Sequence, residues 1–374
     1  MRTLRLVVSL ALLGVAPAIV ADPRALAQQA PTSDSPPDAA LDAAGRKAVV
    51  QDLAQALRKS YVFPDIGERY AAGLQRKLAA GGYRETTAVA FADAVNKDLQ
   101  AIHKDGHLRI RFNPAFHPRA NPDAAPTPAE KAEFWKRAAA TGFGVEKIER
   151  LPGNIGLLDL RGFAPTEFAS GPLSAAMSLL ASTDALIIDL RQNGGGDPET
   201  VAYLCSYFFP EGEQVHVNDI YDRPRNETRQ FWTQSSVPGP RYVDKPVYLL
   251  TSARTFSGAE EFSYDLQTLK RATVVGELTG GGAHPVDAAA VGSGFVAFVP
   301  RGRAINPITR TNWEGVGIKP DIAAPAAQAL QSAHLTALRT LLKSEQDAAR
   351  RAMLERVIAQ VEKGESPAPV YTHP

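Results

Sequence analysis

The sequence predicts an α/β protein in which a core built around a largely parallel sheet follows a small helical bundle. Two patterns predict this class. After about residue 151, short apolar runs of strand length alternate with helical stretches, as in a sheet covered on both faces. Before residue 113, three longer stretches carry apolar residues at helical spacing. The chain has 374 residues, which exceeds the ~150 of one typical domain and is ample for a large core.

Residues 1–27 have the features of a secretory signal. Two arginines precede the apolar run 6–20, and Ala25 and Ala27 provide a small-x-small cleavage site. The run is shorter than the ~20 apolar residues of a membrane-spanning helix, so an uncleaved anchor is the weaker interpretation. We therefore expect a periplasmic or extracellular protein with no stable membrane insertion after signal cleavage.

The rest of the chain divides by composition and periodicity. The predicted parts are a disordered tether at 28–43, a helical domain at 44–112, a connecting segment at 113–150, the α/β core at 151–328, and a C-terminal helix and tail at 329–374. Within the helical domain, helices are predicted at 44–61, 66–80 and 87–103. In the core, the predicted strands are 155–163, 185–191, 246–252 and 272–278, and the helices between them are 169–180, 197–209 and 258–270. A hairpin is predicted at 215–234 and a long C-terminal helix at 331–362.

Composition excludes several function classes. The formal net charge is +1, so nothing marks the chain as a binder of nucleic acid or of an anionic membrane. Cys205 is the single cysteine, which forbids a disulfide within the chain and a thiolate metal site. We expect no nucleic-acid partner, no metal and no cofactor.

Two loops that follow strands carry unusual chemistry, and ligands of open α/β sheets bind beyond the carboxyl ends of the strands. The first loop, QNGGGD, contains glycines 194–196, which can turn sharply and point N–H groups at a ligand; a plain tight turn is the alternative. The second, ARTFSGAEEF, puts Ser257 at a helix start, where free N–H groups favour developing negative charge. The alternative there is a capping box, because Glu260 follows three residues later.

A serine nucleophile needs a base, and the histidines are the candidates. His107, in KDGHLRIRF, lies where the helical domain ends, and His284, in TGGGAHP, is the rival base. A zinc pair of His103 with His107 is disfavoured, because HKDGH lacks the glutamate of H-E-x-x-H and contains Gly106. A base also needs a group that orients its other ring nitrogen. Glu314, in TNWEGVGIKPDI, is a candidate, although spacing alone would equally suit a surface carboxylate.

Six segments, taken in order, carry a family resemblance that covers roughly residues 45–325. They are YVFPD at 61–65, KDGHLRI at 104–110, DLRQNGGG at 189–196, TSARTFSGAEEF at 251–262, RATVVGELTGGGAH at 271–284 and EGVGIKPDI at 314–322. Together they resemble the tail-specific, or C-terminal processing, serine peptidase family. The likeness is greatest to its branch with tricorn protease and the interphotoreceptor retinoid-binding protein modules.

The resemblance implies a crotonase-like α/β core behind the helical bundle, and it implies a role for each matching residue. Ser257 matches the nucleophile, His107 the base, and Glu314 the glutamate that completes the relay. The oxyanion would be held by the N–H of Gly258 and by that of Gly194 or Gly195. The implied substrate is a peptide or an unfolded protein.

The sequence departs from the family pattern in three places. The T-x-G-K stretch that carries lysine in serine–lysine enzymes is here 279–282, TGGG, so a dyad mechanism is not expected. The segment 113–151 is too short for the PDZ domain that many members carry. The serine that precedes the histidine in tricorn is replaced by Gly106.

We therefore predict a secreted serine-type peptidase that acts through a Ser/His/Glu acyl-enzyme mechanism. The alternative is a non-enzymatic binder of retinoid- or fatty-acyl-like ligands on the same fold, although a carrier needs no intact Ser/His/Glu set. A hydrolase of esters or other small acyl compounds is a third possibility.

Overall fold

The fold is described by a computed structural model, which covers residues 38–117 and 126–364 of the chain. The predicted signal peptide and the first part of the predicted tether lie outside these residues. From Asp38 onward the chain forms one unit. No helix in the described ranges is long and apolar enough to cross a membrane.

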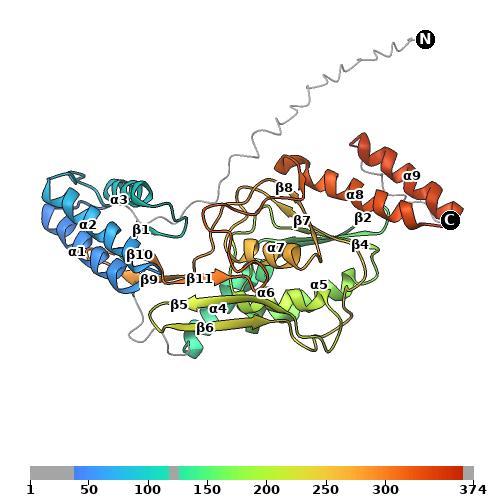
Figure 1. Cartoon of the computed structure of the whole chain (residues 1–374), viewed down its shortest axis with the longest axis horizontal. Coiled ribbons are helices and arrows are strands. Elements are labelled where there is room, and N and C mark those ends of the chain that lie inside the picture. The colour runs from blue at the N-terminus through green and yellow to red at the C-terminus, as the bar shows by residue number, and fades with distance from the viewer. Residues whose placement is uncertain (1–37, 118–125, 365–374) are drawn as a thin grey trace, which may run out of the picture. The chain divides into compact units, whose positions relative to one another are not determined.

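Three amphipathic helices form a bundle at the start of the described chain (Figure 1). They are α1 (Ala43–Ser60), α2 (Pro64–Ala79) and α3 (Ala88–Ile102), each within two residues of its predicted bounds. Helix α1 begins at Ala43 because the Asp42 side chain accepts the Gly45 N–H at 2.7 Å. The apolar faces of the bundle share one core with an antiparallel sheet of the strands β1 (Arg109–Phe112), β10 (Phe295–Pro300) and β9 (Val286–Ala290).

The centre of the fold is a six-stranded sheet with the order β12-β8-β7-β4-β3-β2. The strands are β2 (Val145–Leu151), β3 (Ile155–Leu160), β4 (Ala185–Asp189), β7 (Val247–Thr251), β8 (Thr273–Gly276) and β12 (Ile322–Ala323). All neighbours pair in parallel except β2 with β3, so the predicted largely parallel sheet is confirmed. The carboxyl ends of β4 and β7 consequently meet at one edge, where the two glycine- and serine-bearing loops emerge.

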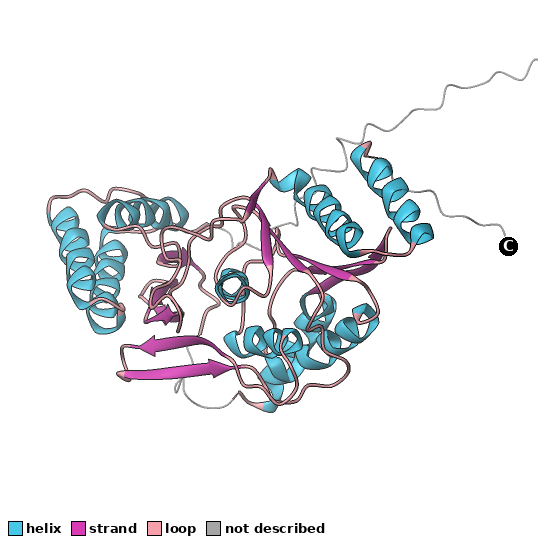
Figure 2. Cartoon of the chain, turned by 45° about the vertical axis from the view of Figure 1, so that its right-hand side comes forward, coloured by secondary structure: helices cyan, strands magenta, loops and turns pink. Residues whose placement is uncertain are grey.

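Helices cover both faces of this sheet (Figure 2). On one face lie α5 (Thr166–Leu180), α6 (Pro198–Cys205) and α7 (Gly258–Thr268), and on the other lie α8 (Ala329–Ser344) and α9 (Ala348–Glu362). Strand side chains alternate between the two cores: Leu186 and Ile188 join the first, whereas Ile187 joins the second. Burial on both faces explains why these strands read as continuous apolar runs.

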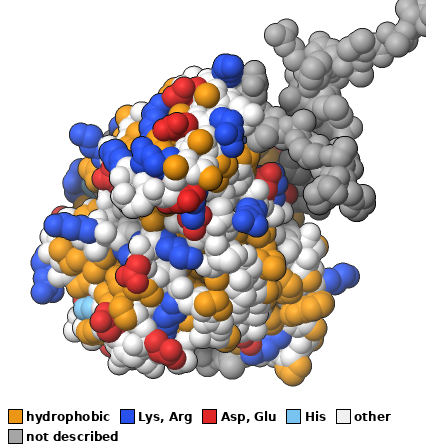
Figure 3. Space-filling view, turned by 90° about the vertical axis from the view of Figure 1, so that its right-hand side faces the viewer, with side chains coloured by type: hydrophobic (Ala, Val, Ile, Leu, Met, Phe, Trp, Pro, Cys, Tyr) orange, Lys and Arg blue, Asp and Glu red, His pale blue; other side chains and the backbone are white. Residues whose placement is uncertain are grey.

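A second antiparallel sheet lies beside the core and holds the predicted hairpin. Its strands are β5 (His216–Asp222), β6 (Glu227–Trp232) and β11 (Gly302–Ile305), in the order β11-β5-β6. The remaining elements are helix α4 (Pro128–Ala140) and the short 3₁₀ turns at Gly142–Gly144, Ser206–Phe208 and Ala326–Gln328. The face in Figure 3 carries basic and acidic side chains interspersed with apolar ones, in keeping with the near-zero net charge.

Three predicted boundaries differ from the structure. The single helix predicted at 331–362 is two helices, because the chain turns after Ser344 and Asp347 caps α9 by accepting the Arg350 N–H at 2.7 Å. Residues 38–42 of the predicted tether pack on the bundle, where the Leu41 side chain is buried. Strand β2 starts at Val145, within the predicted connecting segment, and forms an edge of the central sheet.

Candidate active site

Ser257 lies at the carboxyl end of the central sheet, between β7 and the start of α7. Its backbone has φ 55° and ψ −124°, whereas an ordinary N-cap residue is extended. A non-glycine residue in such a conformation costs ~1–3 kcal/mol, and it persists only where the surroundings hold it, most often at functional sites. The capping box that the sequence allowed is present, but this strain sets Ser257 apart from an ordinary helix cap.

The buried carboxylate of Glu260 holds the start of α7 in place. Its two oxygens accept the N–H groups of Ser257 at 2.9 Å, Gly281 at 2.7 Å and Gly282 at 2.8 Å, and the hydroxyl of Thr279. Burial raises the pKa of Glu260, and these hydrogen bonds oppose the rise. Glu260 therefore links Ser257 to the loop that follows β8, mainly through hydrogen bonds that it accepts from main-chain N–H groups.

The loop after β4 packs directly against Ser257, and Asn193 orders it. The Asn193 side chain accepts the Gly195 N–H at 2.8 Å and donates to the Leu160 carbonyl at 3.0 Å. A Cβ on Gly195, whose φ is 102°, would lie 2.7 Å from the Ser257 Cβ. Only glycine fits this close approach, so the glycine run is more than a tight turn.

The three glycines proposed as oxyanion donors differ in their surroundings. The N–H of Gly195 is used inside its own loop by the bond to Asn193. Gly194 and Gly258 line the same cavity as Ser257, and Gly258 opens helix α7. Main-chain N–H groups at a helix start are suited to stabilising an anion.

His107 lies between α3 and β1 and is 7% exposed. Its ring packs on that of Phe256, with ring centroids 4.5 Å apart and an interplanar angle of 38°. Because Phe256 immediately precedes Ser257, this contact joins the candidate base to the candidate nucleophile. A Cβ on Gly106 would lie 3.0 Å from the Phe256 ring, which gives a physical reason for glycine at that departure from tricorn.

Asp105 is the centre of a buried network behind His107. One oxygen accepts the main-chain N–H groups of His107 at 3.0 Å and Leu108 at 3.3 Å. The other accepts the hydroxyl of Tyr61 at 2.8 Å and a bond from His284 Nδ1 at 2.9 Å. Burial opposes ionisation of Asp105, but the hydrogen bond and charge of His284, with the Tyr61 and His107 bonds, bring its pKa below the ordinary value.

Glu314 approaches the same network from the other end of the chain. Its Oε2 accepts the Ala283 N–H at 2.6 Å and lies 3.4 Å from His284 Nδ1. Its Oε1 is buried without a hydrogen-bond partner in the described part of the chain. Ligand-type atoms of Glu314, Asp105 and His107 lie within 4.8 Å of one another, so these three could also hold a metal ion.

Burial shifts the pKa of His107 and that of Glu314 in opposite directions. It lowers the pKa of His107 to about 4, so the imidazole is neutral near pH 7, as a general base must be. It raises the pKa of Glu314 to about 7; the His284 charge opposes this rise, and Asp105 adds to it. His107 Nδ1 is buried and has no hydrogen-bond partner among the residues described.

The structure brings four of the predicted residues to one cavity. Ser257, His107, Gly194 and Gly258 all line a cavity of about 430 Å³. Neither Glu314 nor the rival base His284 lines it; both belong to the buried network with Asp105. His103 is absent from the one group of potential metal ligands found in residues 38–117 and 126–364.

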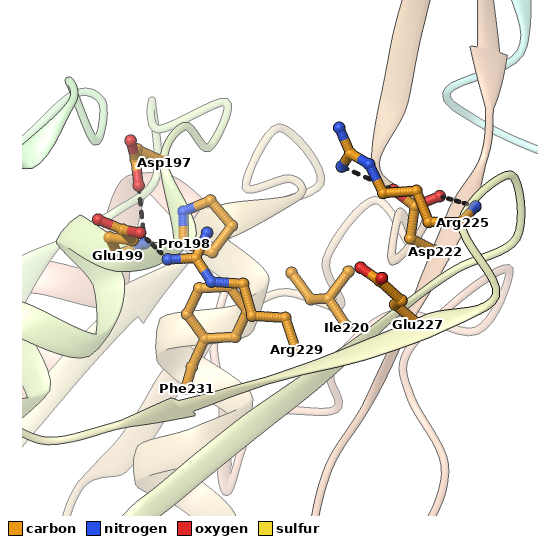
Figure 4. Close-up of a pocket in the computed structure, with 9 residues that line it drawn as sticks. All are labelled: Asp197, Pro198, Glu199, Ile220, Asp222, Arg225, Glu227, Arg229 and Phe231. Atoms are coloured by element: carbon orange, nitrogen blue, oxygen red, sulfur yellow. Dashed lines mark hydrogen bonds and ion pairs between the residues drawn. The ribbon is translucent and has the colours of Figure 1, made fainter. Parts of the chain in front are cut away.

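A groove adjoins this cavity and shares Pro198 and Ile220 with it (Figure 4). It lies between the start of α6 and the β5–β6 hairpin. Two arginines line it, and both have carboxylate partners: Arg229 pairs with Glu199 and also lies over the Phe231 ring, and Arg225 pairs with Asp222. Both arginines are therefore compensated, and carboxylates outnumber arginines in the lining, which also contains Asp197 and Glu227.

Two family descriptions match the chain and together cover most of the described residues. Peptidase family S41 matches residues 154–324, and the N-terminal domain of peptidase S41 in eukaryotic IRBP matches residues 43–146. The chain belongs to peptidase family S41. Membership places it among the serine-type peptidases, and the predicted family resemblance is confirmed.

Curated relatives of this S41 chain include two bacterial proteases. The carboxy-terminal-processing protease of Bartonella bacilliformis is 28% identical over 179 residues, which is 46% of this chain and 39% of that protein. The tail-specific protease of Haemophilus influenzae is 30% identical over 98 residues, 26% of this chain and 13% of that protein. The matched parts thus span less than half of either relative.

Solved structures share the fold at low identity. A lipoprotein from Streptococcus agalactiae is 14% identical with a TM-score of 0.51, and the match covers 79% of this chain and 97% of that one. A putative peptidase from Parabacteroides merdae is 19% identical with a TM-score of 0.50, and the match covers 75% and 90%. Both likenesses concern the architecture.

Sequence reasoning missed several residues that organise the site. Asp105 lies in the KDGHLRI segment beside His107, but nothing in the sequence gives it a role. Glu260 was noticed only as half of a capping box, and Tyr61 only as part of YVFPD. In each case the residue lies in a segment that the sequence singles out, but its partners lie far away in the chain.

Proposed function

We propose that this S41 chain is a secreted serine peptidase that hydrolyses peptide bonds through an acyl-enzyme. The observation that carries the proposal is the strained Ser257, which opens a helix and shares a cavity with a buried, neutral His107. The core is proposed to be crotonase-like and to follow the bundle and a connecting segment that ends where β2 begins. Export is proposed to depend on residues 1–27.

In the proposed first step, His107 removes the proton of the Ser257 hydroxyl, and Oγ attacks the substrate carbonyl carbon. The oxyanion that forms is held by the N–H groups of Gly258 and Gly194. The imidazolium then gives its proton to the leaving amine as the peptide bond breaks. Water, deprotonated by the same ring, releases the acyl group and restores the serine.

Glu314 and Asp105 have supporting roles in this mechanism. A carboxylate near the ring of His107 stabilises the imidazolium that forms after proton transfer. Glu314 is proposed for this role, because its Oε1 has no other partner among the described residues. Asp105 is a positioning residue, since it binds the main-chain N–H of His107.

The cavity favours an acyl-transfer site over a carrier of apolar ligands. A retinoid- or fatty-acyl-like ligand needs a mostly apolar pocket. The lining of the cavity beside Ser257 is mixed: the polar side chains of His107, Arg109 and Glu261 lie among apolar ones such as Phe256 and Trp313. A peptide, with its alternating donors and acceptors, suits this lining better.

The test is labelling by a fluorophosphonate together with hydrolysis of denatured casein. Wild type is expected to label and to release peptides. Ser257→Ala is expected to lose both, with kcat reduced by about 10⁴–10⁶ and a nearly unchanged melting temperature. Labelling of Ser257→Ala at the wild-type level would disprove the assignment, and tight binding of a fluorescent fatty acid without hydrolysis would support the carrier.

A further inference from the structure

Arg109 is a charged residue in the cavity that the proposed reaction does not use. It follows His107 by two residues on β1 and lines the cavity with Ser257. Its Nη1 donates to the His107 carbonyl at 3.2 Å, and its guanidinium carbon lies 4.6 Å from the centre of the Phe298 ring. The Nε is buried and has no hydrogen-bond partner among the described residues.

No carboxylate of the described residues pairs with Arg109. The one charged side chain that acts on it is Arg111, whose repulsion adds to the effect of burial, so that the pKa of Arg109 falls below its ordinary value. The arginines of the adjoining groove are different, because Arg229 and Arg225 both have carboxylate partners (Figure 4). Arg109 is thus the cavity's uncompensated positive charge.

A half-buried guanidinium without a counterion is costly, and the cost falls when an anion arrives. Arginine presents N–H groups in a planar fork that matches the two oxygens of a carboxylate. The Phe298 ring, paired with Arg109 across β1 and β10, supports one face of this fork. This arrangement suits Arg109 to bind an anion.

Glu261 also lines the cavity and could repel an anion. Burial raises its pKa to about 7; the nearby Asn218 amide opposes the rise, and the charge of Asp197 adds to it. Below neutral pH, Glu261 is therefore largely uncharged. An incoming carboxylate then meets one positive charge and no comparable negative one.

We infer that Arg109 binds a carboxylate of the substrate close to the scissile bond. This inference rests on the proposed peptidase function. The carboxylate has two possible sources, the C-terminus of the peptide or an Asp or Glu side chain. The cavity has a volume of about 430 Å³, and an extended peptide spans ~3.3 Å per residue. A carboxylate that lies in this cavity together with the cleaved bond is therefore within about three residues of that bond.

The experiment compares matched peptides built around a bond that the protein cleaves in denatured casein, located by mass spectrometry. One pair ends two residues after that bond, as a free acid or as an amide. A second pair carries Glu or Gln within three residues of the bond, with both ends blocked. We expect kcat/KM to be about 10–100-fold higher for the charged member of at least one pair, as charge-assisted bonds predict.

The favoured pair identifies the source of the carboxylate. Arg109→Gln is expected to reduce the ratio of charged to neutral peptide to about one, and Arg109→Lys to restore part of it. Arg111→Gln is the matched control, because it removes the same charge from the same strand at an exposed residue outside the cavity lining. It is expected to change the ratio by less than about twofold.

Binding of fluorescent versions of these peptides to Ser257→Ala, measured by anisotropy, does not require turnover. If wild type cleaves no bond in casein, the same pairs are built on casein segments of arbitrary sequence, and binding that discriminates the charged member would then support Arg109 and reject the peptidase. Hydrolysis with equal kcat/KM and equal affinity within both pairs would overturn the Arg109 inference and keep the peptidase. A preference that survives Arg109→Gln in the folded variant would also overturn it.

Discussion

The nucleophile side and the base side of the proposed site are built in different ways. Ser257 is positioned by main-chain geometry: its own strained backbone, the close glycine loop, and N–H groups bound to Glu260. His107 is positioned by a network of ionisable side chains centred on Asp105, with Tyr61 contributed by the bundle.

This difference predicts which side of the site should respond more strongly to pH. The strained backbone of Ser257 and the close glycine loop do not titrate, and the hydrogen bonds to Glu260 oppose the rise of its pKa, so we expect the nucleophile side to respond less to pH. On the base side, burial has moved the pKa of His107 to about 4 and that of Glu314 to about 7. We therefore expect pH and conservative polar substitutions to act on activity chiefly through the base side.

The largest effect should come from removing the base itself. His107→Ala is expected to lower kcat/KM for peptide hydrolysis by about 10⁴ or more, because the imidazole that takes the serine proton is lost. His284→Ala, which removes a buried partner of Asp105, is the comparison and should cost about tenfold. The opposite ranking would move the base to His284.

The next prediction compares one buried carboxylate from each side. Asp105→Asn is expected to lower kcat/KM by about 10²-fold and the free energy of unfolding by about 3 kcal/mol, because a buried charged network loses its centre. Glu260→Gln should lower the free energy of unfolding by about 2 kcal/mol but kcat/KM by only about tenfold. Chemical denaturation and peptide hydrolysis measure both. A larger loss of activity in Glu260→Gln than in Asp105→Asn would contradict the proposed difference between the two sides.

The pH profile gives a third test. Since the Glu314 carboxyl is protonated below its pKa of about 7 and His107 is neutral above about 4, kcat/KM should fall as pH falls through 7 because Glu314 loses its charge. Glu314→Gln should lower the rate by about 10²-fold and flatten the profile between pH 5.5 and 8.5. A limb near pH 7 that persists in Glu314→Gln would assign the titration to another group.

The smallest effect is expected from Tyr61→Phe, which removes one hydrogen bond to Asp105. The free energy of unfolding should fall by about 1 kcal/mol and kcat/KM by less than about threefold. Tyr70→Phe is a matched control, because Tyr70 lies edge-on to Tyr61 but its hydroxyl donates to the His103 carbonyl. If Tyr70→Phe lowers activity as much as Tyr61→Phe does, then altered packing, and not the lost bond to Asp105, causes the effect of Tyr61→Phe.

The elements of the core could be predicted because their signals are local. Strands β3, β4 and β7 are buried on both faces and therefore appear as apolar runs. The break between α8 and α9 gives no such signal, since no glycine or proline separates the two helices. The capping role of Asp347 becomes visible only once the turn is known.

Within the site, Ser257, His107 and Glu314 were predicted from the ordered motifs, whereas Asp105 was not. Its partners Tyr61 and His284 are 44 and 179 residues away in the chain. Contacts at such separations leave no periodicity and no spacing rule in a single sequence. The choice between His107 and His284 had the same obstacle, because both histidines lie beside glycines and differ only in what surrounds them.

The pairing of β1 with β10 has a consequence for how this chain can be divided. Strand β1 pairs with residues 295–298 of β10. The segment that follows His107 is therefore hydrogen-bonded to the second half of the chain. A fragment that begins after residue 113 would contain Ser257 but would lack the proposed base, His107. It would also leave β10 with an open rim, which is a template for self-association.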